Sequence, residues 1–305
     1  MLPELFRSAG HRVTELADGP VPASAADVVL LQGNAAWFPR AIAQLSALAP
    51  GSRPFVVIWH GEPLPPPRDS RLPRARLHRR ELAKILLRDR RATDVYTNAR
   101  RLQLMVRRGL PDLLAVTTQG RAAYLRERGI RCEWVPLGYE PGHGENLGLE
   151  RDIDILFLGA LDVPRRRKSL RRLRRKGLEV TAVGSWSAPE YWGTQRTRLL
   201  NRAKVMLNIS RHPGDLADLR FILGMANGAC VVSEPVHRPA PFQPGEHYVS
   251  LELDAMPESL PGLLATPGLR TPITEAGHRL VTGELTLERS VARLLDLIAD
   301  ARARR

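Results

Sequence analysis

A cluster of positive charge follows an apolar segment in the second half of the chain. Residues 153–158 read Ile-Asp-Ile-Leu-Phe-Leu, Gly159 comes next, and a helix is expected to begin near Pro164. The first turn of this helix carries Arg165, Arg166 and Arg167. A buried strand that ends at glycine and leads into a proline-started helix suits a phosphate group, because helix-end N–H groups and guanidinium forks converge on one anion. The pattern predicts a nucleotide-linked ligand.

The run 165–176 has nine basic residues in twelve and no acid. Such a run is also typical of a nucleic-acid-binding stripe or of a solvated helix face. Its first residues come nearest to the end of the strand, where a diphosphate would need them, and the later arginines are expected on the surface. We therefore favour diphosphate contact by at least one of the first three arginines.

Polar residues also follow a second apolar segment, residues 204–209. Asn208 and Ser210 lie where this strand is expected to end, and Asp215 lies in the following loop. Asp215 is interpreted either as a ligand for a sugar hydroxyl or, slightly favoured, as the N-cap of the next helix.

That helix, expected over residues 217–227, and the strand after it supply the remaining candidates. Arg220 on the helix is expected to meet the ligand or to pair with Glu234 at the end of the strand over residues 229–233. Gly228 and Ser233 belong to the same segment.

His60, Gly61 and Glu62 follow a strand expected over residues 54–60 in the first half. Open α/β sheets place their sites at the carboxyl ends of parallel strands. A histidine or glutamate there can act as a general base toward a hydroxyl group. The alternative is a turn histidine with a structural partner, and Glu62 is slightly favoured over His60 if the reaction inverts configuration.

Strand-like segments alternate with helix-like segments along the chain, which predicts β-α-β units and parallel sheets. The alternation stops in a glycine-rich stretch near residues 138–150 and restarts at residue 153. The sequence therefore predicts an α/β protein of two tandem Rossmann-like domains. Their expected bounds are 1–138 and 152–305, with a linker over 139–151.

The composition of the chain limits the kinds of partner and the compartment that can be expected. The chain of 305 residues carries a net charge of +14, and each half contributes +7 (22 basic against 15 acidic, then 24 against 17), so no tail concentrates it. This excess favours an anionic substrate, an anionic membrane surface or nucleic acid, in that order.

No apolar run is long enough to span a membrane and no signal peptide is evident, so we expect a cytoplasmic protein. Cys132 and Cys230 are expected to be buried, reduced thiols.

The chain resembles GT-B-fold glycosyltransferases, most closely the bacterial group-one and spore-maturation-protein types. The resemblance is carried in the second half by Phe157-Leu-Gly159, Arg165-Arg-Arg167, Val205-Met-Leu-Asn208, Arg220, Met225-Ala-x-Gly228 and Val231-Val-Ser-Glu234. In the first half it is weaker, through Asp27–Gly33, Asp94–Thr97 and Trp134-Val-Pro-Leu-Gly138.

The resemblance implies that the C-terminal domain binds a nucleoside-diphosphate sugar and the N-terminal domain an acceptor, with sugar transfer, of hexosyl type, in the cleft between them. His60 and Glu62 are then the catalytic candidates. The donor-binding candidates are Gly159, Arg165, Arg166, Arg167, Asn208, Asp215, Arg220, Gly228, Ser233 and Glu234. No D-x-D run is present, and arginines can neutralise a leaving diphosphate, so neither a metal nor a further cofactor is expected.

One departure from the family pattern affects function. Retaining members usually carry two glutamates eight positions apart, and alignment on Met225-Ala226-x-Gly228 puts Leu223 and Asp215 at those positions. Leu223 cannot accept a hydrogen bond from a hydroxyl group. Donor binding is then organised around Asp215, Arg220 and Glu234, or the chain is a catalytically inactive GT-B-like binding or scaffold protein.

The segment 68–91 holds ten basic residues against three acids and leads from a proline-rich loop into an amphipathic helix. We expect it to meet an anionic partner such as a lipid-linked acceptor or the inner membrane leaflet. Nucleic acid is disfavoured because the chain lacks an aromatic stacking run.

The start of the chain predicts an incomplete first domain. Residues 2–10 read as a helix and residues 11–16 as a strand, without the strand that ordinarily opens a GT-B N-terminal domain. Because that strand is central in a doubly wound sheet, its loss leaves unpaired edges. Either the reading frame starts upstream, or residues 11–16 pair directly with residues 27–33.

Overall fold

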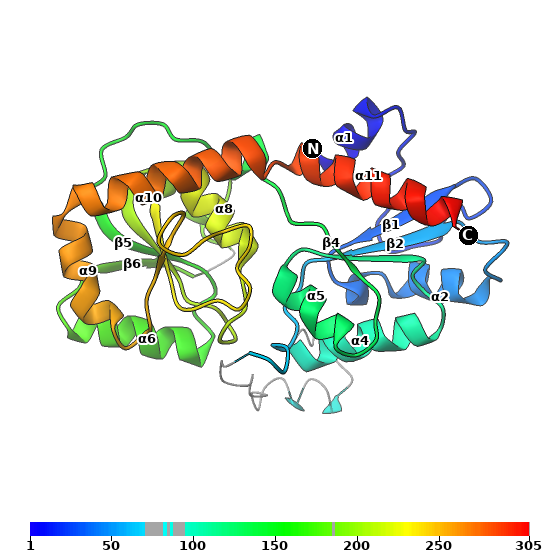
Figure 1. Ribbon diagram of the computed structural model, residues 1–305, viewed down its shortest axis with the longest axis horizontal. Helices are drawn as coiled ribbons and strands as arrows, with labels where there is room; N and C mark the ends of the chain where they lie inside the picture. Colours follow the sequence, from blue (N-terminus) through cyan, green and yellow to red (C-terminus); the bar gives the residue numbers. More distant parts are fainter. Residues whose placement is uncertain (71–81, 84–85, 88–94, 185–186, 305) are drawn as a thin grey trace. The chain divides into compact units, whose positions relative to one another are not determined.

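The computed structural model describes residues 1–70, 82–83, 86–87, 95–184 and 187–304, and it divides into two compact units. Unit 1 comprises Met1–Pro136 together with Glu288–Arg305, and unit 2 comprises Leu137–Leu287. Each unit is a parallel β-sheet with helices packed against it (Figure 1).

Unit 1 contains a four-stranded sheet with the strands in chain order, all parallel. The strands are β1 (Val28–Gln32), β2 (Phe55–His60), β3 (Leu113–Val116) and β4 (Glu133–Trp134). All six residues of β2 are buried, because a central strand of a parallel sheet is covered on both faces.

Helices cover both faces of this sheet. In the described part of the chain they are α2 (Pro39–Ala47), α4 (Val95–Arg107), α5 (Gln119–Arg126) and α11 (Leu287–Ala303), with a 3₁₀ turn η1 at Ala35–Trp37, whereas α1 (Leu2–Ser8) has no buried residue. Residues of α2, α4 and α5 form one core with Val56, Ile58 and Leu114. Helix α11 runs along the opposite face (Figure 1) and buries Leu294.

The prediction of a strand over residues 11–16 is wrong, and so is the one of the two alternatives in which this strand pairs with residues 27–33. These residues form no strand, and within the described residues β2 is the one sheet neighbour of β1. The apolar residues Val13 and Leu16 are three positions apart, so a strand would point them to opposite faces and neither face would be apolar. Leu16 is in fact exposed.

Unit 2 contains a five-stranded parallel sheet in the order β6-β5-β7-β8-β9. The strands are β5 (Ile153–Leu158), β6 (Val180–Val183), β7 (Ala203–Asn208), β8 (Cys230–Ser233) and β9 (Val249–Ser250). Strand β5 pairs with β6 on one side and with β7 on the other, so the strand order reverses there. In open α/β sheets such a switch point forms a crevice at the carboxyl ends of the strands, where ligands bind.

The helices of unit 2 lie on both faces of its sheet. They are α6 (Pro164–Arg175), α7 (Gly193–Arg202), α8 (Asp218–Ala226), α9 (Met256–Ala265) and α10 (Pro267–Arg279), with short helical turns η2 (Pro141–His143), η3 (Pro189–Tyr191) and η4 (Leu280–Glu284). Residues of α6 and α9 pack against Phe157 and Val205, whereas residues of α7 and α8 pack against Leu156 and Met206. Successive residues of each strand therefore serve opposite faces.

The two units differ from the domain bounds expected from the sequence. Residues 288–305 belong to unit 1, and residues 139–151 belong to unit 2 instead of forming a separate linker. Tyr139 N–H donates to the Leu285 carbonyl (2.7 Å), and Leu287 N–H donates to the Tyr139 carbonyl (2.8 Å). A Cβ atom at Gly138 would lie 2.1 Å from the Leu287 nitrogen, so these two segments touch backbone to backbone.

No helix in the described part of the chain has both the length and the apolar character needed to cross a bilayer. Cys132 and Cys230 are free and buried, as expected, and burial raises the pKa of each thiol to about 11. Both thiols are therefore neutral at physiological pH and poor nucleophiles.

Candidate functional site

Two arginines and a phenylalanine meet at the switch point of unit 2. Phe157 is a buried residue of β5, Arg166 lies in the first turn of α6, and Arg220 lies in the first turn of α8. The guanidinium carbons of Arg166 and Arg220 lie 5.7 Å and 5.5 Å from the centre of the Phe157 ring. Contact of this kind between a cation and an aromatic ring is attractive, and it fixes both guanidinium groups at the carboxyl end of the sheet.

Backbone carbonyl groups hold Arg166 in place. Its Nε donates to the Ile209 carbonyl (2.8 Å), its Nη1 donates to the Ala160 carbonyl (3.3 Å), and only 6% of the residue is exposed. These acceptors are neutral, so they orient the guanidinium group without cancelling its charge.

Arg220 is held in a similar way from the other helix. Its Nε donates to the Leu158 carbonyl (3.1 Å) and its Nη1 to Asn208 Oδ1 (2.5 Å). A Cβ atom at Gly159 would lie 3.0 Å from Arg220 Nη2 and 3.1 Å from the Phe157 ring. Glycine at this position therefore leaves the space that the guanidinium group occupies.

The electrostatics of these side chains favour an anion. Burial lowers the pKa of Arg166 to about 9, and the nearby charges of Arg220 and Arg211 contribute to that lowering. Burial also lowers the pKa of Arg220 to about 10, an effect that Tyr191, Glu234 and Asp215 partly oppose. Both groups are cationic at neutral pH, and an anion placed between them would relieve their repulsion.

Arg165 has a different role from its neighbour. It forms a two-pronged ion pair with Glu234, in which Nη1 donates to Oε1 (2.7 Å) and Nη2 donates to Oε2, and Nη1 also donates to the Ser210 carbonyl (3.0 Å). Glu234 is only 4% exposed and accepts a further bond from Ser210 N–H (2.7 Å). The charge of Arg165 is thus neutralised inside the protein, and the pair ties α6 to the ends of β7 and β8.

Asn208 and Ser233 form a buried chain of hydrogen bonds behind Arg220. Asn208 Nδ2 donates to Ser233 Oγ (2.8 Å), and Ser233 Oγ donates to the Glu234 carbonyl (2.7 Å). The acceptor oxygen of Asn208 is thereby turned toward Arg220. Asn208 and Ser233 position the arginine.

Asp215 lies in the loop between β7 and α8, where its carbonyl accepts a bond from Ser210 Oγ (2.7 Å). The favoured interpretation of Asp215 as a helix N-cap is wrong, because α8 has Ala217 at that position and no capping side chain. Its carboxylate lies near enough to raise the pKa of Arg220.

Two candidates are not brought into this cluster. Arg167 is exposed on α6, because one residue along a helix turns the side chain by about 100° from the buried position of Arg166. Gly228 follows α8 and precedes β8, so it lies at the amino end of the strand whose carboxyl end carries Ser233. Its φ of 70° ends the helix, as glycine commonly does.

His60 and Glu62 lie at the carboxyl end of β2 in unit 1, as predicted. His60 is 1% exposed, and neither side-chain nitrogen has a hydrogen-bond partner among the described residues. Burial lowers its pKa to about 3, with a contribution from the charge of Arg121, which the nearby Gly33 and Glu62 backbone groups only partly oppose. The imidazole is neutral and weakly basic, which makes His60 a poor general base.

Sequence reasoning missed the aromatic components of the cluster. Phe157 was named only as part of the motif Phe157-Leu-Gly159, and nothing in its neighbours in sequence shows that two arginines will flank it. Tyr191 interacts electrostatically with both arginines but lies far from them along the chain, in a loop without a motif. The one sequence feature that could have pointed to Tyr191 is the pair of adjacent aromatic residues, Tyr191-Trp192, directly before a helix.

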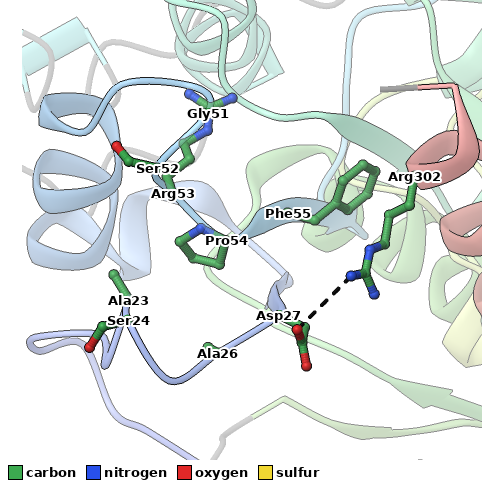
Figure 2. A pocket seen from close by; sticks show the side chains of 10 residues that line it. All are labelled: Ala23, Ser24, Ala26, Asp27, Gly51, Ser52, Arg53, Pro54, Phe55 and Arg302. Atoms are coloured by element: carbon green, nitrogen blue, oxygen red, sulfur yellow. Dashed lines mark ion pairs between the residues drawn. The ribbon is translucent and has the colours of Figure 1, made fainter.

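Two further observations concern ligands. Among the described residues, no group of three or more His, Cys, Asp or Glu side chains is arranged to hold a metal ion. Figure 2 shows an open pocket in unit 1 lined by Asp27 and Phe55, at the amino ends of β1 and β2, and by Arg302 of α11. It lies at the opposite edge of the sheet from His60, and Asp27 pairs with Arg302 across it at 4.0 Å.

Comparison with known proteins shows the fold and one matched domain. Residues 165–296 match the family model described as glycosyl transferase-like. Solved structures with the same fold include TarM of S. aureus (11% identity, TM-score 0.61, covering 89% of this chain and 54% of TarM). They also include sucrose-phosphate synthase from Thermosynechococcus elongatus (16% identity, TM-score 0.58, covering 92% of this chain and 74% of the synthase). A third is HepE of Anabaena with UDP and glucose (12% identity, TM-score 0.59, covering 89% of this chain and 78% of HepE).

The chain therefore has the GT-B fold, as the sequence resemblance predicted, and carries a glycosyl transferase-like domain over residues 165–296. It spans about half the length of TarM. A search of curated protein sequences gives no match.

Proposed function

We propose that the protein is a glycosyltransferase that uses a nucleoside-diphosphate sugar as donor. The observation that carries the proposal is the pair of partly or fully buried arginines, Arg166 and Arg220, at the switch point of unit 2 with neutral hydrogen-bond partners. A diphosphate supplies the negative charge that this pair lacks. Two proteins of the same fold, TarM and HepE, have been solved in complex with UDP, which supports a nucleotide ligand for this fold.

The chemistry follows from the charge. When the glycosidic bond to the donor breaks, negative charge develops on the departing diphosphate. Two guanidinium groups held in place by carbonyls stabilise that charge without reorganising. Each charge-assisted hydrogen bond contributes roughly 1.5–3 kcal/mol. The group transferred is proposed to be a hexosyl group, and the arginines are proposed to take the place of a metal ion.

Unit 1 is proposed to bind the acceptor, with Glu62 as the base that takes the proton from its hydroxyl group. The low pKa of His60 favours Glu62 for this role. A lipid-linked acceptor or an anionic membrane is proposed to meet the basic segment 68–91. Most of that segment lies outside the described residues, but Leu86 and Leu87 within it are 73% and 81% exposed.

A second candidate function is donor binding without turnover. Leu223, which stands where retaining relatives are expected to carry a glutamate, packs in the core with Leu156 and Met206 and is 5% exposed. It offers no hydrogen bond to a donor hydroxyl. This candidate is favoured if a matching nucleotide-sugar binds but is neither transferred nor slowly hydrolysed.

Calorimetric titration with UDP and GDP tests the proposal, with Arg167 as a built-in control for Arg166. Arg166→Ala is expected to weaken binding about 10- to 150-fold, the equivalent of roughly 1.5–3 kcal/mol. Arg167→Ala removes the same charge from the adjacent, exposed position and should change affinity less than threefold, about 0.6 kcal/mol. Equal losses in the two variants, with both still folded by circular dichroism, would remove Arg166 from the site.

A further inference from the structure

Two aromatic side chains lie in sequence between β6 and α7. Tyr191 ends the turn η3, and Trp192 is the residue directly before the first turn of α7. Their ring centres are 5.5 Å apart with planes inclined at 55°. Tyr191 is partly buried, whereas Trp192 is 50% exposed, so a large indole surface faces solvent beside a half-buried phenol.

This aromatic pair lies next to the arginine cluster. Strand β6 is the immediate neighbour of β5 in the sheet and ends at Val183, eight residues before Tyr191. Tyr191 packs against the core cluster that contains Leu158, the last residue of β5, and the carbonyl of Leu158 accepts the hydrogen bond from Arg220 Nε. Cationic and aromatic surfaces therefore share one edge of unit 2.

A nucleoside diphosphate has the matching chemistry, since it joins an anionic diphosphate to a flat aromatic base through one ribose. Exposed tryptophan faces bind bases by stacking, and stacking accepts any base because every base has a π-face. Inorganic pyrophosphate has the same anionic part but no base. The two ligands thus separate the contribution of the arginines from that of the aromatic pair.

We propose that Trp192, supported by Tyr191, is the platform on which the nucleobase of the donor stacks. This inference rests on the proposed function, because it takes the arginine pair as the diphosphate site. It assigns base binding to stacking, so Trp192 contributes similarly to the affinity for UDP and for GDP and contributes nothing to the affinity for pyrophosphate.

Calorimetric titration of the full chain with UDP, GDP and pyrophosphate tests this platform. Trp192→Ala should weaken UDP and GDP binding about 5- to 100-fold and leave pyrophosphate affinity within about twofold of the unaltered protein. Trp192→Phe retains a ring and should recover most of the loss. Trp37→Ala is the matched control, since Trp37 is also exposed (55%) but belongs to unit 1.

Three outcomes would overturn the inference. If Trp192→Ala binds UDP as the unaltered protein does, the base does not stack there, and the proposed function still stands on the arginines. If the variant loses UDP and pyrophosphate affinity by the same factor, Trp192 acts through the arginines and not on a base. If the unaltered protein binds neither UDP, GDP nor pyrophosphate, the inference and the proposed function fail together.

Discussion

At the scale of single residues, the ion pair between Arg165 and Glu234 shows that a charged side chain can hold a helix in place and not bind a ligand. Three consecutive arginines have three different environments. Arg165 is neutralised by the carboxylate of Glu234, Arg166 keeps its charge beside Phe157, and Arg167 is exposed. The sequence predicted the arginine cluster and its place at a strand end. It could not assign the three roles, because they depend on where Glu234 and Phe157 lie in space.

Glu234→Ala is expected to destabilise unit 2 by about 2–3 kcal/mol. This is less than the roughly 3–5 kcal/mol typical of breaking a fully buried pair, because Arg165 keeps 26% of its side chain exposed. Replacing both partners at once, as in Arg165→Met with Glu234→Leu, should recover part of the loss, since no unpaired charge remains. Urea unfolding of the single and double variants measures both values, and a double variant no more stable than Glu234→Ala would contradict the account.

The buried His60 predicts a pH dependence of stability. Its pKa in the folded protein, about 3, lies below the ordinary histidine value of 6.5, so between these values the unfolded chain binds the proton that the folded chain excludes. Stability is therefore fully present above pH 6.5 and is lost as pH falls toward 3, by up to about 1.4 kcal/mol per pH unit for one proton.

His60→Asn should flatten this dependence, because the replacement does not titrate. Urea unfolding followed at about pH 7, 5.5 and 4.5 gives the slopes to compare. Equal slopes for the unaltered protein and His60→Asn would show that His60 does not titrate as the structure indicates. His143 in unit 2, whose pKa burial lowers to about 4, adds a similar but separate dependence.

At the scale of secondary-structure elements, the strand ends position the site, and this level was the most predictable. The strands expected at 153–158, 204–209 and 229–233 match β5, β7 and β8 to within a residue or two, because buried parallel strands read as continuous apolar runs. The strand at 11–16 failed, since its apolar residues do not share one face. Helix N-caps were harder to predict. Helix α8 begins without a capping side chain, so the aspartate at position 215, a residue type common at N-caps, was misleading.

Gly159 at the end of β5 supports a prediction on this scale. Gly159→Ala places a methyl group 3.0 Å from Arg220 Nη2, and the guanidinium group must move to admit it. We expect UDP affinity to fall about tenfold, or roughly 1.4 kcal/mol.

Gly262→Ala is the control for that variant, because Gly262 lies inside α9 and a methyl group added there would have nothing within 4 Å. It should raise stability by about 0.5–1 kcal/mol through helix propensity and leave affinity unchanged. Thermal unfolding and calorimetry on both variants give the comparison. Unchanged UDP binding in Gly159→Ala would show that Arg220 does not need the space.

At the scale of the whole molecule, the C-terminal helix belongs to the sheet of the first unit. The sequence analysis placed the residues of α11 in the second domain, expected over residues 152–305, because a sequence pattern can show that a helix has an apolar face but not which sheet covers it. Its residues Val291, Leu294 and Ile298 are buried, and the helix is grouped with residues 1–136.

Leu294→Ala should therefore weaken unit 1 and not unit 2. Truncation of a fully buried leucine costs about 2–5 kcal/mol, and the loss is expected in the unit that the helix completes. Hydrogen exchange followed by mass spectrometry should show faster exchange in β1 and β2 with little change in β5 and β7. Faster exchange confined to β5 and β7 would show instead that the helix stabilises unit 2.

The return of α11 to unit 1 also bears on the order in which the protein is completed during synthesis. Unit 2 is one continuous stretch, Leu137–Leu287, and all its strands are available once that stretch has left the ribosome. Unit 1 begins first but lacks the cover for one face of its sheet until α11 has been made, after the whole of unit 2. Domains of a growing chain generally mature from the N-terminus onward. Here the second unit is expected to reach its native state before the first, because one face of the first sheet stays uncovered until α11 has been made.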